Sequence, residues 1–354
     1  MKSIFVHGMG AVSPAGWGVP ALRAALERKQ TLPETNLARP GWEKMLTVRQ
    51  VPPPPERPAF LGHPRLRRAS AIAHHIVAAG LEAVGEDATP VQNGSMRIGI
   101  VVCLMAGCVT YSRRFCEEVF KEPATASPLM FPETVFNAPA SHLAAFLASS
   151  GINYTLIGDE GTFVQGLALA AEWLCGGRAD GCVVAGGEEL DWIVADAMRL
   201  FQRQAILSSG AGALYLRADD SPGALAELAA ITDSFPFTEN QNRAAAARKM
   251  RRQLGSARTE FPATEAKELL CLGTQKRARL DAAETEAWRD WTGPRLAPKE
   301  MLGEAFAASA AWQCVAVCDA LQRGEVSAAN VSVVGVNQQA IGARFIRPNL
   351  LPVL

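Results

Sequence analysis

Imidazole is the side chain most often used for proton transfer near neutral pH, and this sequence places all of it before residue 143. The histidines are His7, His63, His74, His75 and His142. His74 and His75 fall on a predicted helix, where a surface or core position is more typical than a catalytic one. A reaction that needs imidazole from the C-terminal half of the chain therefore has no residue to supply it.

Thiols show no arrangement typical of a metal site or a redox pair. The eight cysteines include no CxxC pair and have no histidine cluster beside them, so we expect buried free thiols, no metal and no cofactor. Cys271 is the one candidate nucleophile that we considered. It would end a strand instead of starting a helix, so the lowered pKa that activates a thiol would be missing, and we expect it to be buried and inert. The cysteines are Cys103, Cys108, Cys116, Cys175, Cys182, Cys271, Cys314 and Cys318.

A carboxylate occupies the junction between an apolar strand and an apolar helix. Glu160 follows a predicted strand at residues 154–157 and precedes a helix that begins near Gly161. Backbone N–H groups at the start of a helix carry partial positive charge, which lowers the pKa of a thiol there and also suits a carboxylate. Glutamate is a weak nucleophile, but a general base remains an alternative for Glu160 if burial raises its pKa.

Short apolar runs rich in β-branched residues alternate with longer segments of helical spacing, which is typical of a parallel sheet covered by helices. The predicted strands are residues 3–6, 97–104, 154–157, 181–185, 213–216, 269–272 and 331–336. The predicted helices are residues 67–84, 138–149, 161–174, 281–291 and 304–321. The pattern predicts an α/β fold.

Length and charge limit the class of protein. The chain has 354 residues, 49% of them hydrophobic, as in a globular protein of two α/β units. With 35 basic and 35 acidic residues, its net charge does not favour nucleic acid or anionic lipid. The most apolar run is shorter than the ~20 residues that a membrane-spanning helix needs, and the N-terminus is interpreted as a first strand. We expect a cytoplasmic protein with no nucleic-acid or membrane partner.

Several segments, in order along the chain, resemble those of β-ketoacyl synthases. The first is residues 8–14, Gly-Met-Gly-Ala-Val-Ser-Pro, which is similar to that family's first strand and turn. Residues 176–188 resemble its helix end, strand and Gly-Gly-Glu turn. Further resemblances are residues 209–214 to Glu-Gly-Ala-Gly, 272–274 to His-Gly-Thr, and 299–304 to Lys-x-x-x-Gly-His. The resemblance implies a thiolase-like fold with two similar α/β halves, residues 1–220 and 221–354, in αβαβα layers.

The three reactive positions of that family do not carry its catalytic residues here. A condensing enzyme of the family uses one cysteine and two histidines, whereas this chain has Glu160, Leu272 and Glu304. A small shift of the alignment cannot restore the histidines, because none follows His142. The resemblance therefore implies a degenerate site with no catalytic residue.

A fold retained without its reactive groups is expected to act through its shape. The precedent in the family is the chain-length factor of type II polyketide systems, a subunit that pairs with a catalytic ketosynthase as a heterodimer and shapes its acyl tunnel. The resemblance places the strand at 154–157 at the dimer interface and the region 107–136 beside the tunnel, although each side chain there could equally be plain core. The candidates are Cys108, Tyr111, Phe115, Met130 and Phe131 for the tunnel, and Tyr154, Thr155 and Leu156 for the interface.

Two other hypotheses and one surface remain open. The chain is alternatively an enzyme with relocated chemistry that uses Glu160 as acid or base, or a homodimeric ligand-binding relic of the fold. Residues 240–258 form a basic segment on a predicted exposed helix. We interpret it as a solvated face, with docking of an acidic acyl carrier protein as the sharper alternative.

Overall fold

The computed structural model describes residues 2–201, 205–219, 223–238, 241–260 and 267–348, and its frame is one extended mixed sheet. The strands of this sheet are β1 (Phe5–Ser13), β2 (Gly16–Trp17), β5 (Ile98–Leu104), β6 (Asn153–Ile157), β7 (Gly181–Glu188), β9 (Gly210–Arg217), β10 (Ala226–Ile231), β11 (Phe235–Pro236), β12 (Glu268–Cys271), β13 (Arg295–Leu296), β14 (Ala328–Val334) and β15 (Gln339–Ile346). Their order is β13-β12-β14-β15-β10-β1-β9-β7-β5-β6, with β2 paired to β1 and β11 to β15.

A small second sheet lies above this frame. It contains β3 (Thr35–Leu37), β4 (Leu46–Arg49) and β8 (Leu207–Ser208). The helices are α1 (Val19–Arg28), α2 (Ala71–Val84), α3 (Ala88–Gln92), α4 (Val109–Lys121), α5 (Ala138–Phe146), α6 (Thr162–Cys175), α7 (Trp192–Phe201), α8 (Arg243–Glu260), α9 (Ala278–Ala287), α10 (Pro298–Leu302) and α11 (Ala307–Gln322).

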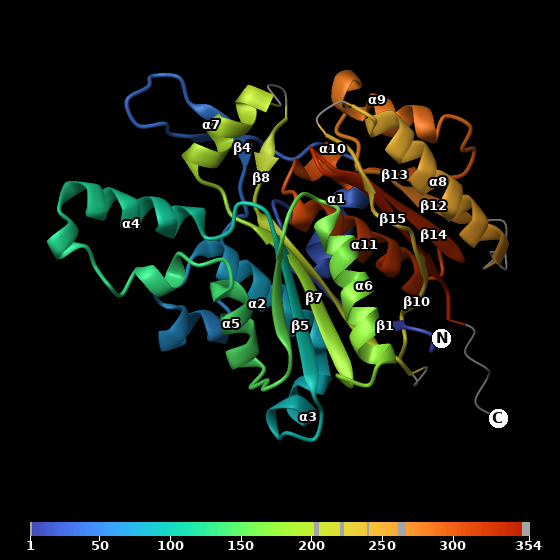
Figure 1. Cartoon of the computed structure of the whole chain (residues 1–354), viewed down its shortest axis with the longest axis horizontal. Helices are drawn as coiled ribbons and strands as arrows, with labels where there is room; N and C mark the ends of the chain where they lie inside the picture. Colours follow the sequence, from blue (N-terminus) through green and yellow to red (C-terminus); the bar gives the residue numbers. More distant parts are fainter. Residues whose placement is uncertain (1, 202–204, 220–222, 239–240, 261–266, 349–354) are drawn as a thin grey trace.

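Helices and sheet alternate in layers (Figure 1). Helix α2 packs on β1, β9 and β7 and is covered by α5, whereas α8 packs on β15 and is covered by α9. Helices α6 and α11 lie between the two parts of the sheet, because α11 contacts β9 and β7 as well as β14. The α/β architecture confirms the predicted fold class. The sheet is mixed and not parallel throughout as predicted, because β9 pairs antiparallel with β1 and β7, and β15 pairs antiparallel with β10 and β14.

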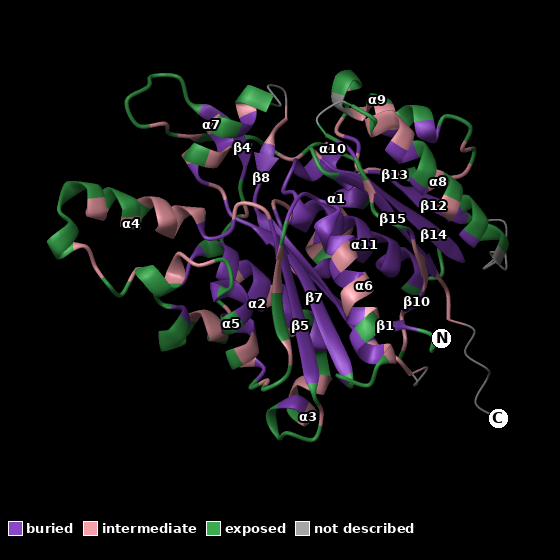
Figure 2. Cartoon of the chain, viewed as in Figure 1, coloured by how far each residue is buried: buried purple, intermediate pink, exposed green. Residues whose placement is uncertain are grey.

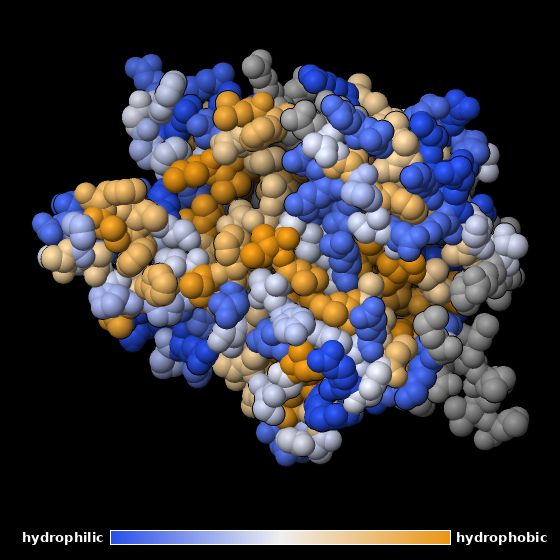
Figure 3. Space-filling view, viewed as in Figure 1, coloured by the Kyte–Doolittle hydropathy of each residue, from blue (hydrophilic) through white to orange (hydrophobic). Residues whose placement is uncertain are grey.

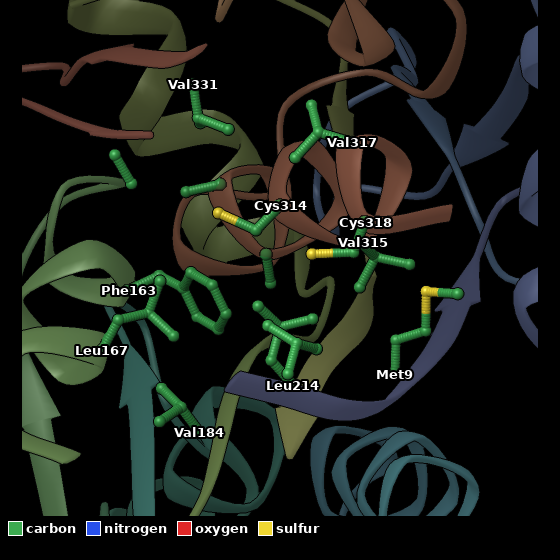
Figure 4. Packing of buried hydrophobic residues seen from close by; sticks show 14 of the residues in the cluster. Met9, Phe163, Leu167, Val184, Leu214, Cys314, Val315, Val317, Cys318 and Val331 are labelled. Carbon is green, nitrogen blue, oxygen red and sulfur yellow. The ribbon is translucent and has the colours of Figure 1, made fainter. Parts of the chain in front are cut away.

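Helix α11 is the centre of the core. Every residue from Ala307 to Leu321 is buried, and most of them are small, which lets strands approach from two sides (Figure 2). The indole N–H of Trp312 lies 3.2 Å from the Val12 carbonyl and 3.0 Å from that of Ala211, so the polar group of this buried side chain is satisfied. Figure 4 shows Cys314 and Val315 of α11 packed among Phe163 of α6, Leu214 of β9 and Val331 of β14.

The structure extends and corrects the sequence prediction. The first strand continues to Ser13, and α11 begins at Ala307, three residues later than predicted, because Phe306 has a φ of 44° that interrupts the helix. The apolar pattern does not predict α1, α7, β10 or β15. The predicted boundary between residues 220 and 221 lies outside the described residues, and the division into 1–220 and 221–354 stays a prediction.

The eight thiols are free, but not all of them are buried. Cys116 on α4 is exposed and Cys175 is half-buried, which corrects the expectation for these two residues, since α4 has no buried residue and Cys175 is the last residue of α6. Cys271 is fully buried, and burial raises the pKa of its thiol well above the usual value, as expected for an inert residue. Among the described residues, no helix combines the length and the apolar character needed to cross a membrane.

Candidate functional site

Glu160 lies in the short connection between β6 and α6. The strand ends at Ile157, the helix begins at Thr162, and the carboxylate between them is 1% exposed. Its Oε2 accepts a hydrogen bond from the backbone N–H of Val336 at 2.8 Å, and its Oε1 lies 3.1 Å from the Nζ of Lys299. Both oxygens of Glu160 are therefore engaged by donors.

Lys299 joins the two acidic positions that the sequence singled out. Its ammonium group, on α10, is buried and lies 2.7 Å from Oε2 of Glu304 as well as 3.1 Å from Glu160. Burial alone would lower the pKa of Lys299, but the two carboxylates raise it, so the lysine stays charged. One ammonium group thus serves two buried carboxylates.

Glu304 is the most enclosed member of this cluster, with 0% exposure. Besides Lys299, the amide of Gln275 donates to Oε2 at 2.6 Å, and the backbone N–H of Phe306 donates to Oε1 at 2.8 Å. The strained positive φ of Phe306 turns this N–H toward the carboxylate. The backbone of Glu304 is held in turn by β8, since its carbonyl accepts from the N–H of Ser208 at 2.7 Å.

The two carboxylates differ in their electrostatic balance. Burial would raise the pKa of Glu160, but Lys299 and the backbone N–H donors outweigh burial and lower it. Burial raises the pKa of Glu304 to about 8, and the charge of Glu160 adds to this rise while Lys299 opposes it. The pKa shift of Glu160 is therefore downward, not the rise that burial alone would give, and its role as an acid or base stays a prediction.

Leu272 does not join the charged cluster. It follows β12 and packs in an apolar cluster with Leu270, Trp288 and Val334. The next residue, Gly273, lies close to it: a Cβ built on Gly273 would be 3.8 Å from the Lys299 side chain and 3.4 Å from Glu284. The position predicted for the first family histidine is therefore beside the cluster, with an aliphatic side chain directed into a core.

Asp159, the residue before Glu160, also stabilises the connection between β6 and α6. Asp159 is buried, and its Oδ2 accepts from the backbone N–H of Gln338 at 3.0 Å, while the backbone N–H of Asp159 donates to Oε1 of Gln338 at 3.0 Å. Gly335 has no room for a side chain, because a Cβ there would lie 1.9 Å from Asp159. The loop that follows β14 is thereby locked against the strand–helix junction.

These contacts hold the carboxylate of Glu160 in one orientation. Each of its oxygens accepts one hydrogen bond, Oε1 from Lys299 and Oε2 from the backbone of Val336. The described residues contain no group of three His, Cys, Asp or Glu side chains that could hold a metal ion. Glu160, Lys299, Glu304 and Gln275 thus form one connected network of buried hydrogen bonds and ion pairs.

The predicted tunnel residues lie on α4 and in the turns after it. Cys108 is buried, Tyr111, Phe115 and Met130 are half-buried, and Phe131 is 55% exposed, with its ring centroid 5.7 Å from that of Phe115. Figure 1 shows that this segment projects from the body of the molecule. The structure gathers these residues on one projection, and their role beside a tunnel stays a prediction.

The predicted interface residues lie on an edge strand. Strand β6 ends the sheet order and pairs with β5 alone among the described strands. Tyr154 is 50% exposed and rests against the ring of Trp173, whereas Thr155 and Leu156 are half-buried. The buried hydroxyl of Thr155 has no hydrogen-bond partner in the described structure. An outward edge with apolar and unpaired groups is therefore present where the interface was predicted.

Lys299 is the main residue that the sequence analysis left without a role. It was noted only as part of the segment at 299–304, yet it lies 139 residues from its partner Glu160. Its place in a Lys-x-x-x-Gly pattern was the available signal. Gln275 belongs to no motif of the sequence, and the N–H of Val336 is a backbone donor, which every residue except proline has. Neither could be identified from the sequence.

Comparison with known proteins shows similarity at the level of the fold. No family model and no curated protein matches the chain. The structure is similar to the ishigamide ketosynthase/chain length factor, with a TM-score of 0.78, 20% identity and coverage of 98% of this chain and 99% of that chain. It is also similar to a chain of the AntDE:AntF complex, a type II polyketide synthase acyl-carrier protein with its ketosynthase bound to the hexaketide, with a TM-score of 0.80, 16% identity and coverage of 98% and 100%.

A third similar structure is a β-ketoacyl synthase from Burkholderia phymatum STM815, with a TM-score of 0.79, 16% identity and coverage of 99% and 100%. Similarity at such low identity is similarity of fold, and here it extends over the whole length of each chain. The chain therefore has the thiolase-like fold of the ketosynthases, with a lysine-bridged pair of glutamates at its centre.

Proposed function

We propose that this chain is a non-catalytic, ketosynthase-like subunit that pairs with a catalytic ketosynthase and shapes its acyl tunnel, as a chain-length factor does. The observation that carries the proposal is the cluster of Glu160, Lys299 and Glu304. At the positions that resemble the reactive cysteine and one reactive histidine of the family, it has two carboxylates that a buried ammonium group holds in place. Such a network stabilises the fold but offers neither a thiolate nor an imidazole to a thioester.

Relocated chemistry at Glu160 receives less support from the same contacts. A general base needs a pKa near the working pH, whereas Lys299 and the backbone donors lower the pKa of Glu160. The arrangement favours a structural role for this carboxylate.

The surface supports a partner on the side of β6 and α4. Large apolar side chains are exposed there, namely Phe120, Leu129, Phe131, Phe136, Tyr154 and Ile157. Figure 3 shows hydrophobic atoms gathered over the projecting α4 segment and toward the middle of the same face. Apolar surface of this kind, beside an unpaired strand edge, favours a protein interface. Two of the similar structures are described as a ketosynthase with a chain length factor or with an acyl-carrier protein, which agrees with such a partner.

Co-expression with an intact ketosynthase encoded beside this chain tests the pairing. We expect native mass spectrometry to find a one-to-one heterodimer, and the double variant Tyr154→Glu/Ile157→Glu to abolish it, because two charges would be buried at the edge of β6. Met45→Glu is the matched control, since Met45 is equally exposed but lies away from β6, before β4. A chain that remains a monomer or a homodimer beside that ketosynthase contradicts the proposal and favours the ligand-binding relic.

A second variant distinguishes the hypothesis of a non-catalytic subunit from that of an enzyme that uses Glu160. In the co-expressed complex, Glu160→Gln should leave the rate of condensation within about twofold of the parent, because Glu160 makes no chemical contribution. A general base would lose about 10²-fold or more. A rate loss of that size, in a variant whose heterodimer still forms, would assign the chemistry to Glu160.

A further inference from the structure

A basic hollow runs along α8, away from the cluster of Glu160 and Lys299. Its volume is about 820 Å³, and its walls are one side of α8 and the two tryptophans that follow α9. Five of the residues that line it are basic and none is acidic; the basic ones are Arg248, Lys249, Arg251, Arg252 and Arg258. The whole chain has equal numbers of acidic and basic residues, so this one helix concentrates positive charge locally.

Two of these arginines are held in place by the tryptophans. The guanidinium group of Arg251 lies 5.4 Å from the ring of Trp288, and that of Arg258 lies 4.9 Å from the ring of Trp291. Arg251 also pairs with Asp290 at 2.6 Å, and Arg258 pairs with Glu268 at 2.6 Å. They are therefore positioned before any ligand arrives, which lowers the entropic cost of binding.

The other three cations face solvent without an acidic partner. Arg248, Lys249 and Arg252 are exposed, and none of them takes part in an ion pair among the described residues. Lys249 makes only a distant contact with the ring of Phe235, at 6.0 Å. Figure 3 shows the area over α8 as strongly hydrophilic. Three unpaired cations beside two fixed ones form a surface that attracts negative charge.

The shape and extent of the hollow indicate the kind of ligand. From residue 248 to 258 a helix rises by about 15 Å, which is too long for a single phosphate group and suits a row of carboxylates. No large hydrophobic side chain of the described part of α8 is exposed, Trp288 is only 2% exposed and Trp291 is half-buried, which does not favour insertion into a lipid bilayer. The sequence pI of about 7.0 is far from that of typical nucleic-acid-binding domains.

We propose that this hollow is a docking surface for an acidic helix of a partner protein. Carboxylates three and four residues apart on that helix would lie along the row of Arg248, Lys249 and Arg252, while the fixed arginines set its direction. The acidic carrier protein considered from the sequence is a partner of this chemistry. The proposal extends the function proposed above but does not depend on it, because the hollow is formed without β6, α4 or Glu160.

A peptide titration tests it directly. The probe is a fluorescein-labelled alanine–glutamate helix of about 18 residues, with glutamates three and four positions apart, and its anisotropy is followed as the full chain is added at low salt. We expect saturable binding that weakens at least about tenfold in the triple variant Arg248→Glu/Lys249→Glu/Arg252→Glu, and that also weakens as salt is added. The milder set Arg248→Gln/Lys249→Gln/Arg252→Gln should weaken binding less than the reversal but in the same direction.

Matched controls separate docking from general charge attraction. Reversal of three exposed cations elsewhere, Arg67→Glu/Arg68→Glu/Lys121→Glu, changes the net charge equally and should leave peptide affinity within about twofold. A peptide with glutamine in place of glutamate should not bind. The proposal is overturned by equal binding to both triple variants, by binding of the neutral peptide, by no binding at all, or by tighter binding of duplex DNA or phosphatidylserine vesicles at the same salt.

Discussion

The ammonium nitrogen of Lys299 lies 2.7 Å from Oε2 of Glu304, and neither side chain is more than 3% exposed. Buried charges are costly unless they are paired, so each of these two residues depends on the other. Because Glu160 shares the same ammonium group, the loss of Lys299 would leave two carboxylates without a cation.

Lys299→Met is therefore expected to lower the free energy of unfolding by about 3–5 kcal/mol at neutral pH. The loss should shrink at acidic pH, where Glu160 takes up a proton and no longer needs a cation. Urea unfolding followed by circular dichroism measures the difference. Lys276→Met serves as the control, because Lys276 pairs with Glu300 at 3.1 Å but is 71% exposed, and it should cost about 1 kcal/mol or less. Equal losses in the two variants would contradict the dependence on Lys299.

Stability should fall as the pH rises through the neutral range. Burial raises the pKa of Glu188 and of Glu304 to about 8, and that of Glu284 to about 7. The unfolded chain releases these protons near pH 4.5, so the folded state holds more protons between that pH and about 8, and the free energy of unfolding decreases over this window. Burial lowers the pKa of His75 to about 3. This shift makes the free energy of unfolding increase with pH, but only below about pH 6.5, the usual pKa of histidine.

Glu188→Gln tests this pH dependence. Glu188 accepts hydrogen bonds from the backbone N–H groups of Met105 and Ala106, and glutamine keeps its size but cannot titrate. Between pH 6.5 and 8.5 we expect the slope of unfolding free energy against pH to become shallower by up to about 1.4 kcal/mol per pH unit. Glu286→Gln, at an exposed position of α9, should leave the slope unchanged. An unchanged slope in Glu188→Gln would show that this carboxyl does not titrate there.

Two glycine-to-alanine substitutions should change the free energy of unfolding in opposite directions. Gly335→Ala places a methyl group 1.9 Å from Oδ2 of Asp159 and 2.4 Å from its Cγ, so the loop after β14 or the junction at Asp159 must shift. We expect a loss of about 2 kcal/mol or more. Gly255→Ala lies on α8 with open space around it and should stabilise the chain by about 0.5–1 kcal/mol. Thermal unfolding of both variants checks the contrast, and a stabilised Gly335→Ala would contradict the close approach.

Thiol reactivity should separate the cysteines by burial. In the folded chain we expect a thiol reagent to label exposed Cys116 rapidly and half-buried Cys175 more slowly. Burial raises the pKa of Cys108 and Cys182 to about 12, so these and the other buried thiols should react only after unfolding. Cys116→Ser should remove the fast phase. Rapid labelling of more than two thiols would mean that the core opens on the timescale of the reaction.

Much of the fold could be predicted from apolar patterning. The strands near β5, β6, β7 and β9 are runs of small and branched apolar residues, and all are present. Strand β15 was missed because its core positions include polar ones: Arg344 is 0% exposed and bonds Asn330 at 3.0 Å, and it is also paired with Glu268. A buried ion pair between distant strands has no hydrophobic period, so the pattern does not predict such a strand.

The site could be predicted only in part. The resemblance placed Glu160 and Glu304 at family positions, and the structure brings both to Lys299. Whether a buried carboxylate is a base or a structural ion depends on its neighbours, and these come from α10 and from the loop after β14. For Glu160 they reverse the pKa shift that burial alone would give. Long-range contacts of this kind decide the chemistry and are not visible in local sequence.

The burial of α11 on all sides has a consequence for synthesis of the protein on the ribosome. Strands β7 and β9, whose inner faces it covers, leave the ribosome before it does, and β14 and β15 follow it. Until residues 307–346 have emerged, a nascent chain exposes the apolar side chains that later pack on α11. We therefore expect a chain cut short before that point to aggregate or to be degraded.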